Sequence, residues 1–264
     1  RFDDRITGDT EQFCPNAKVI HIDIDPAEIS KNIHADIPIV GDVKNVLIEL
    51  LKEVSEKTNI DWLNQIKEWK NEYPLQYTKR DDEIRPQHAI ETISNITKGE
   101  AVIITDVGQH QMWTAQYYKF NKAGNFCSSG GAGTMGYGVP GGMGAQVGRP
   151  NDIVVSIVGD GGFQMTSQEL MTIMQYKLPV KTVILNNGFL GMVRQWQEIF
   201  HSKRYSSVDL SMNPNFVKLG EAYGMTSIRI EKPEELESKL KEHLLSNEPV
   251  LIEIVVTKED NVFP

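Results

Sequence analysis

Two short polar motifs each end an apolar run of strand length. These are Gly159-Asp160-Gly161-Gly162 and Asn186-Asn187-Gly188, and the residues between them have room for one helix. A strand, a helix and a second strand of these lengths form a βαβ unit, in which the strands are parallel and their carboxyl ends share one edge of the sheet. We therefore expect the Asp160 carboxylate and the Asn187 amide oxygen side by side, where open α/β sheets bind ligands. Such oxygens suit Mg²⁺ that also holds a diphosphate.

Either motif alone is compatible with an ordinary surface turn, and their combination favours the ligand site. The helix between them is predicted over Thr166 to Tyr176, with Thr166 as N-cap and Glu169 completing a capping box. The glycines of the first motif let backbone N–H groups approach an anion closely. The pair of motifs resembles the thiamine diphosphate motif, in which GDG is followed some two dozen residues later by NN.

Three further segments carry candidate ligand contacts. Val107-Gly108-Gln109-His110 follows a predicted strand, so Gln109 and His110 are candidate hydrogen-bond donors to phosphate, although a plain helix-start turn is the alternative. The run Gly130 to Gly138 predicts close approach of backbone to a ligand, with Met135 either filling a core gap or projecting against a bound ring. Met192 and Trp196 are four residues apart on one helical face and either line a substrate entrance or pack in the core.

The composition excludes several classes of protein. The chain has 264 residues, 40% hydrophobic and 24% charged, with a net charge of −9 and two cysteines. The negative charge argues against a nucleic-acid partner, and the apolar runs are too short to cross a membrane. Two cysteines without a CxxC pair argue against a disulfide scaffold or a structural zinc site and favour the reducing cytoplasm. Because the chain starts at Arg1 without Met or a targeting segment, we expect a piece of a longer polypeptide.

Three regions are expected along the chain. Residues 1–54 are predicted to be the end of a Rossmann-like domain, residues 55–85 a charged helical connector, and residues 86–264 an α/β domain with a helix-covered parallel sheet. In the first region, the expected elements are a strand over 18–24, a short helical turn over 26–32, a strand over 37–40 and a helix over 43–54. In the last region, they are helices over 87–97, 111–117, 215–223 and 233–245 and strands over 101–106, 226–230 and 250–255, besides the two motif strands.

With these residues assembled, the chain resembles the catalytic large subunits of the acetohydroxyacid synthase (acetolactate synthase) family along its whole length. The GDG and NN motifs are common to the wider thiamine diphosphate superfamily. The narrower resemblance rests on Arg-Phe-Asp-Asp-Arg at residues 1–5, His-Ile-Asp-Ile-Asp at 21–25, Val-Gly-Gln-His-Gln-Met-Trp at 107–113 and Gly-Met-Val-Arg-Gln-Trp-Gln at 191–197.

The resemblance implies the fold, the cofactors and the reaction. The expected fold is a thiamine-diphosphate-binding domain preceded by the tail of a central FAD domain. The family decarboxylates pyruvate on thiamine diphosphate and transfers the hydroxyethyl unit to pyruvate or 2-oxobutyrate, the first common step of valine, leucine and isoleucine synthesis. Its catalytic subunits form homodimers or homotetramers, sometimes with a small regulatory subunit.

The resemblance also implies residue roles. Asp160, Asn187 and the Phe189 carbonyl would bind Mg²⁺, Met135 would hold the cofactor bent, and Met192 and Trp196 would shape the pocket for the second 2-oxo acid. The remaining expected contacts with thiamine diphosphate are Val107, Gly108, Gln109, His110, Gly133, Gly161, Gly162, Leu190 and Gly191. The expected FAD contacts are Arg1, Arg5, Asp23, Ile24 and Asp42.

The chain departs from the family pattern in one respect. The glutamate that activates the cofactor's pyrimidine lies in an N-terminal domain that this sequence does not contain, so no catalytic residue is assigned and the chain alone is expected to be inactive. The alternatives are another carboligase or decarboxylase of the superfamily, such as glyoxylate carboligase or sulfoacetaldehyde acetyltransferase, and a nucleotide-binding α/β module without catalysis.

Overall fold

The computed structural model describes residues 2–263. They form two compact units, which divide between residues 74 and 75. Arg1 lies outside the described residues, and the side chain of Arg5 is also not described. No helix among the described residues is long and apolar enough to cross a membrane.

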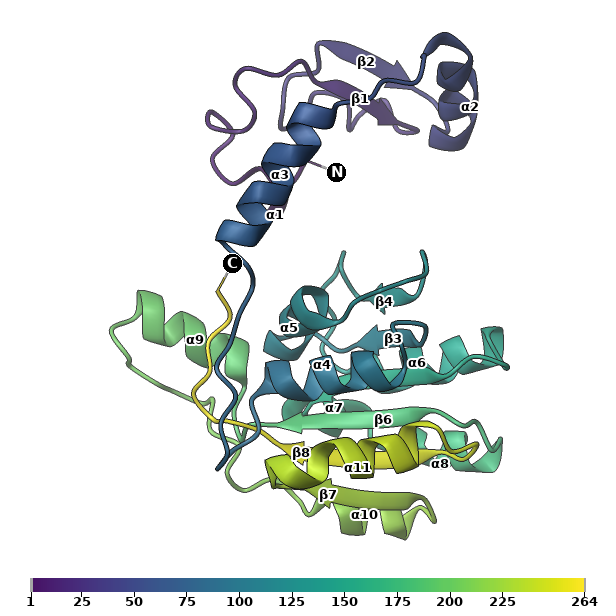
Figure 1. The fold of residues 1–264 in the computed structure, drawn as a ribbon, viewed down its shortest axis with the longest axis vertical. Helices are drawn as coiled ribbons and strands as arrows, with labels where there is room; N and C mark the ends of the chain where they lie inside the picture. The colour runs from purple at the N-terminus through teal and green to yellow at the C-terminus, as the bar shows by residue number, and fades with distance from the viewer. Residues whose placement is uncertain (1, 264) are drawn as a thin grey trace. The chain divides into compact units, whose positions relative to one another are not determined.

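The second unit is built on one parallel sheet of six strands in the order β4-β3-β5-β6-β8-β7 (Figure 1). All five strand pairs are parallel. The strands are β3 (Val102–Thr105), β4 (Phe126–Ser128), β5 (Val154–Gly159), β6 (Lys181–Asn186), β7 (Thr226–Ile230) and β8 (Val250–Val255). Because all strands run the same way, every carboxyl end lies at one edge of the sheet.

Helices cover both faces of this sheet (Figure 1). They are α4 (Pro86–Ile96), α5 (Gln109–Tyr117), α6 (Gly138–Gly148), α7 (Asp160–Thr166), α8 (Glu169–Gln175), α9 (Gly191–Phe200), α10 (Phe216–Ala222) and α11 (Pro233–Leu244). Alternate strand residues face opposite layers. On one face, Ile157 and Val183 pack with residues of α4, α5 and α11, and on the other, Val158 and Ile184 pack with residues of α6, α7, α8 and α10. A sheet covered in this way requires the nearly continuous apolar strands that the sequence shows.

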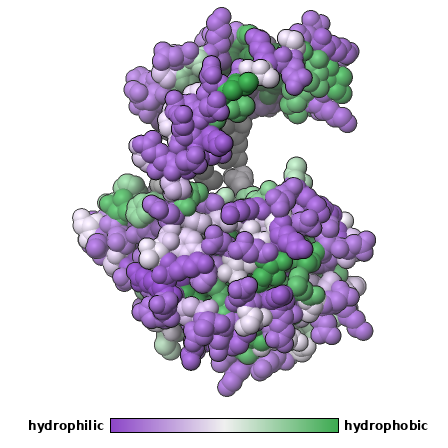
Figure 2. All heavy atoms as spheres, viewed as in Figure 1, coloured by the Kyte–Doolittle hydropathy of each residue, from purple (hydrophilic) through white to green (hydrophobic). Residues whose placement is uncertain are grey.

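The first unit is small and leaves apolar residues at its surface. It contains α1 (Asp4–Thr7), the parallel strands β1 (Ile20–Asp23) and β2 (Ile37–Val40), α2 (Val43–Glu53) and α3 (Ile60–Glu72). No residue of α2 is buried, and Leu47, Ile48 and Leu51 are exposed. Figure 2 shows this apolar surface over α2. The helix forms because its side chains are amphipathic and Asp42 caps its first turn, accepting from the Asn45 N–H at 3.1 Å.

Most of the predicted elements are confirmed. The α/β class, the helix-covered parallel sheet and the strands 37–40, 226–230 and 250–255 agree with the structure. Other elements agree within a few residues at their ends, where assignments are least certain.

Four details were wrong, each for a local physical reason. The helix predicted from Thr166 starts at Glu169 as α8, while Thr166 is the last residue of α7 and its hydroxyl donates to the Gly136 carbonyl at 2.9 Å instead of capping a helix. The helix predicted from Gln111 starts at Gln109, since Gly108 can adopt the φ of +148° that precedes it. Residues 26–30 form hydrogen-bonded turns that do not continue into a helix, and Ser30 has a positive φ. Strand β4 was missed because its three residues follow no strand-like alternation and it pairs only with β3.

Candidate functional site

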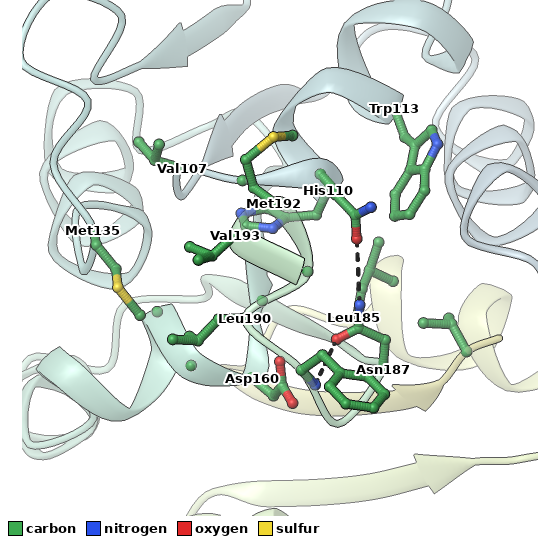
Figure 3. Close-up of a pocket in the computed structure, with 18 residues that line it drawn as sticks. Val107, His110, Trp113, Met135, Asp160, Leu185, Asn187, Leu190, Met192 and Val193 are labelled. Atoms are coloured by element: carbon green, nitrogen blue, oxygen red, sulfur yellow. Dashed lines mark hydrogen bonds between the residues drawn. The ribbon is translucent and has the colours of Figure 1, made fainter. Parts of the chain in front are cut away.

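A pocket lies at the carboxyl ends of β3, β5 and β6 (Figure 3). Three segments of chain reach it directly from these strands, as the βαβ reading predicts. The 18 lining residues are Val107, Gly108, Gln109, His110, Trp113, Met135, Gly159, Asp160, Gly161, Gly162, Leu185, Asn187, Phe189, Leu190, Gly191, Met192, Val193 and Val256. The structure thus brings together all the predicted cofactor contacts of this unit except Gly133, and it places Trp196 outside the pocket lining.

Three helices begin at this pocket. Gln109, Asp160 and Gly191 are the first residues of α5, α7 and α9, and all three line the pocket. Helix N-termini present free N–H groups and positive partial charge, which favour an anionic ligand. No Lys or Arg is among the lining residues. A bound cation would balance the charge of a multiply charged anion at this pocket.

Asp160 and Asn187 project into the same part of the pocket (Figure 3). Asp160 is 1% exposed and Asn187 is 9% exposed. The Asp160 Oδ2 accepts hydrogen bonds from the Gly188 N–H at 3.1 Å and from the Asn213 side chain at 2.7 Å. The Asn187 Oδ1 accepts from the Phe189 N–H at 3.1 Å. These bonds hold a carboxylate and an amide, the two hard oxygen donors predicted from the sequence, in a fixed local geometry.

Burial raises the pKa of Asp160 from 3.8 to about 6, against the hydrogen bonds from Asn213, Gly161 and Gly188, which lower it. A carboxyl whose pKa is raised by folding stabilises the metal-free protein at low pH, and this contribution is lost as the pH rises through about 6. At neutral pH, the buried charge of Asp160 therefore lowers the folding stability of the metal-free protein, and a bound cation would reduce this loss.

This linkage predicts the effect of Asp160→Asn on the metal-free chain. The variant is expected to be more stable than the parent at pH 8, by about 2 kcal/mol, because it buries no charge. The difference is expected to shrink as the pH falls from 6 towards 4. Urea unfolding in EDTA at several pH values measures it, and a parent that is equally or more stable at pH 8 would contradict the burial cost.

His110 is a neutral, buried donor candidate. Its side chain is 8% exposed, and desolvation lowers its pKa to about 4, although the nearby Asp106 opposes the shift. The Nε2 atom has no hydrogen-bond partner among the described residues. A buried polar atom without a partner at the rim of a ligand pocket indicates a group that a ligand satisfies. Neutral imidazole supplies one N–H donor for such a ligand.

The side-chain amide of Gln109 is hydrogen-bonded to other groups of the protein in this structure. Its Nε2 donates to the Gln195 Oε1 and to the Asp260 carbonyl, both at 2.9 Å. Its Oε1 lies 3.4 Å from the Asn187 Nδ2 (Figure 3). Gln109 therefore links the Asn187 loop to α9 and to the C-terminal segment, besides lining the pocket.

Asp106 holds the glycine-rich loop through hydrogen bonds. The sequence had not indicated this role. Asp106 is fully buried, and its carboxylate accepts from the N–H groups of Gly136 at 3.0 Å and Gly138 at 2.8 Å. Gly136 has a φ of +92°, which favours glycine. A Cβ on Gly162 would lie 2.4 Å from the Asp106 Oδ1, so no larger residue fits there. The signal for Asp106 was its place at the end of a buried strand, next to Val107.

The apolar candidates divide between two places. Met135 is 38% exposed at the pocket, and its ε-methyl group lies next to Gly161, as the projecting rather than the core reading predicts. Met192 lines the same pocket. Trp196 is 59% exposed, stacks edge-on with Phe200 at 5.7 Å between ring centroids and lines a separate hollow on α9. It is not a core residue.

Comparison with known proteins shows the family of the chain. The family "Thiamine pyrophosphate enzyme, C-terminal TPP binding domain" matches residues 106–254, and "Thiamine pyrophosphate enzyme, central domain" matches residues 1–50. The first match covers more than half of the chain and all but one of the lining residues. The chain belongs to the thiamine pyrophosphate enzymes.

Curated relatives of this thiamine pyrophosphate enzyme share one name. The chain is 46% identical to the acetolactate synthase isozyme 3 large subunit of Escherichia coli (strain K12), with 100% of this chain and 48% of the relative aligned. It is 44% identical to the acetolactate synthase large subunit of Lactococcus lactis, with 100% and 46% aligned. It is 48% identical to a probable acetolactate synthase large subunit of Methanocaldococcus jannaschii, with 97% and 45% aligned. The chain thus spans about half the length of the curated relatives it matches.

Thiamine pyrophosphate is another name for thiamine diphosphate. The pocket residues fit its diphosphate group. The unpartnered His110 Nε2, the helix N-termini and the small residues Gly161 and Gly162 provide donors and space for an anion. Among the described residues, no group of three His, Cys, Asp or Glu side chains is placed to hold a metal. A cation here would therefore depend on one carboxylate, one amide and backbone oxygen, a donor set that suits Mg²⁺ shared with phosphate.

Three of the predicted FAD contacts, Asp23, Ile24 and Asp42, lie at one edge of the small sheet, while Arg1 and the side chain of Arg5 are outside the described residues. Asp23 ends β1 opposite Val40 of β2, and its Oδ1 accepts from the Asp25 N–H at 2.9 Å. Ile24 follows and is exposed, while Asp42 caps α2 directly after β2. The carboxyl ends of two parallel strands therefore present two carboxylates and an apolar side chain on one side of the unit.

Proposed function

We propose that this chain is the cofactor-binding portion of an acetolactate synthase catalytic subunit. In this reading, the complete protein is a transferase that decarboxylates pyruvate and transfers the hydroxyethyl unit to pyruvate or 2-oxobutyrate. The observation that carries the proposal is the pocket at the ends of β3, β5 and β6, where Asp160 and Asn187 meet three helix N-termini without any Lys or Arg. The names of the relatives support the particular reaction.

The proposed metal is Mg²⁺, bound by Asp160, Asn187 and the Phe189 carbonyl. The diphosphate would lie against the N-termini of α5, α7 and α9, with His110 as a neutral donor. Met135 projects from the glycine-rich wall, where it would press the cofactor into a bent form, and Met192 would line the substrate side. The bound cofactor supplies the electron sink for decarboxylation.

FAD is proposed as a second cofactor of the complete protein. Asp23, Ile24 and Asp42 support this reading, because carboxylates at the ends of parallel strands suit the hydroxyl groups of a nucleotide. Arg1 and Arg5 are proposed to add contacts with its phosphates. Titration of the complete subunit with FAD tests this, since Asp23→Ala should weaken flavin binding without changing thiamine diphosphate affinity.

The remaining proposals concern the assembly. We propose a homodimer or homotetramer of complete catalytic subunits in the cytoplasm, with a small regulatory subunit as an optional partner. The division into 1–54, 55–85 and 86–264 is retained as a proposal for the domain organisation, with the exposed apolar face of α2 covered by the rest of its own domain.

The direct test is cofactor binding by the complete catalytic subunit. Calorimetry should detect thiamine diphosphate binding with Mg²⁺ and none in EDTA, because the pocket lacks cationic side chains. Product analysis with pyruvate alone and with added 2-oxobutyrate should yield acetolactate and acetohydroxybutyrate. Equal binding in EDTA would contradict the proposed metal-dependent site, whereas a different product from glyoxylate or sulfoacetaldehyde would favour another member of the superfamily.

Trp196→Leu is expected to lower the preference for 2-oxobutyrate over pyruvate as the second substrate. The reason is the loss of a large, exposed aromatic surface beside the pocket, where such contacts are worth about 1–3 kcal/mol of discrimination. A competition assay that measures the two product yields tests it, with Tyr176→Leu, the same kind of change at an exposed aromatic residue outside both hollows, as the control. Unchanged product ratios would remove Trp196 from the substrate pocket.

A further inference from the structure

A buried carboxylate lies one strand away from the Asn187 loop. Glu253 is in the middle of β8 and is 1% exposed. Its Oε1 accepts a hydrogen bond from the Asn186 Nδ2 at 2.7 Å, while Oε2 has no hydrogen-bond partner among the described residues. Arg229 of β7 lies 3.7 Å from Oε1 but pairs more closely with Glu231, at 2.8 Å. Such a carboxylate is costly to bury, and neutralisation by Arg229 is only partial.

The hydrogen bond with Glu253 fixes the orientation of the Asn186 amide, and this orientation decides which groups the amide oxygen contacts in the loop after β6. A carboxylate only accepts, so Glu253 holds the amide nitrogen of Asn186 towards itself and turns the amide oxygen away. That oxygen accepts from the Gly188 N–H at 3.0 Å and lies 3.4 Å from the Asn213 Nδ2. If the amide turned over, its oxygen would face the carboxylate and its nitrogen would face two donors.

Both groups that meet the Asn186 oxygen also bond Asp160. The Gly188 N–H is 3.1 Å and the Asn213 Nδ2 is 2.7 Å from the Asp160 Oδ2. The opposite end of the Asn213 amide accepts from the Gln164 Nε2 at 2.8 Å, which fixes its orientation as well. An ordered polar chain therefore runs from Glu253 through Asn186 and Asn213 to the carboxylate at the pocket.

We infer that Glu253, Asn186 and Asn213 are positioning residues that preset the Asp160 carboxylate for a small divalent cation. This inference rests on the proposed function of the pocket. Residues that orient metal ligands contribute strongly to affinity because each ligand otherwise has to be ordered when the metal binds. A rigid site also favours Mg²⁺, which demands near-octahedral geometry, over the larger and more tolerant Ca²⁺.

The test measures cation affinity in the complete catalytic subunit at saturating thiamine diphosphate. Glu253→Leu and Asn213→Ala are each expected to raise the Kd of Mg²⁺ about 10- to 100-fold. Both should also lower the preference for Mg²⁺ over Ca²⁺. Glu253→Gln keeps an oxygen that can accept from Asn186, so it should largely restore the parent affinity. The double variant Glu253→Leu/Asn213→Ala should lose less than the sum of the single losses in binding free energy, because both break one chain.

Thr182→Val is the matched control. Thr182 is fully buried in β6 on the same face as Asn186, and its hydroxyl has no partner among the described residues. This change should leave the Kd of Mg²⁺ unaltered. Should Glu253→Leu fail to fold, Asn213→Ala carries the test, because Asn213 lies in a partly exposed loop.

The outcomes separate the two proposals. If the parent binds thiamine diphosphate without any need for Mg²⁺, the proposed function fails. If the parent needs Mg²⁺ but folded Glu253→Leu and Asn213→Ala keep its Kd and its Mg²⁺/Ca²⁺ ratio, only the positioning role is overturned.

Discussion

Asp160→Ala is expected to abolish Mg²⁺-dependent binding of thiamine diphosphate in the complete catalytic subunit while the fold survives. Asp160 is the one acidic side chain among the residues that line the pocket, and no Lys or Arg is there to take over charge balance. Mg²⁺ in cofactor sites depends on one or two carboxylates, so removing this one leaves only neutral oxygens. The loss should exceed about 100-fold in apparent affinity, at the upper end of what changes around metal ligands cause. Tryptophan fluorescence titration with thiamine diphosphate and Mg²⁺ measures it.

Asp152→Ala is the control for this experiment. Asp152 lies just before the amino end of β5, the strand whose carboxyl end leads into Asp160, and it forms a surface ion pair with Arg149. Removing such a pair is expected to cost at most about 1 kcal/mol of stability and no cofactor affinity. Unchanged thiamine diphosphate affinity in a folded Asp160→Ala subunit would refute the metal assignment.

The second large effect concerns the 264-residue chain by itself, which is expected to form no acetolactate. The only titratable side chains lining its pocket are His110 and Asp160. His110 is held neutral by burial, with a pKa of about 4, and Asp160 is assigned to the metal. By family resemblance, the cofactor's pyrimidine is activated by a carboxylate from another domain. Neither His110 nor Asp160 can take over that role.

The measurement is a colourimetric acetolactate assay with saturating thiamine diphosphate and Mg²⁺, with the complete subunit at equal concentration as the positive control. General acid–base groups contribute about 10²- to 10⁴-fold to enzymatic rates, so the chain without that carboxylate should fall to the level of the blank. Activity of the isolated chain above the blank would show that the activating group is present here after all.

The sequence was sufficient to predict the parts of the site that follow a strand directly. Asp160, Asn187 and His110 come after β-branched and aliphatic runs whose parallel arrangement follows from the helices between them, so their meeting at one edge required no knowledge of packing. The strands 226–230 and 250–255 were predicted with correct ends because turn residues and charged residues bound their apolar runs.

The helix ends around the site could not be predicted in this way. No helix was predicted over residues 160–165, yet residues from Asp160 onward form α7, with Phe163 fully buried against Phe216. Thr166 was read as a cap, but the Gly136 carbonyl takes its hydroxyl. In both cases, a contact with a distant segment outweighs local propensity.

What the sequence by itself determined is the sheet edge at which the chemistry occurs and the kind of oxygen donor found there, since both follow from residue type and from the hand of βαβ units. Only the tertiary structure decided which polar groups hold those donors. Asp106, Asn213 and Glu253 lie 54, 53 and 93 residues from Asp160 in the chain, and no spacing rule connects them. They reach the site because strands β3, β8 and the loop before α10 converge there, and hydrogen bonds form between groups that packing brings within about 3 Å.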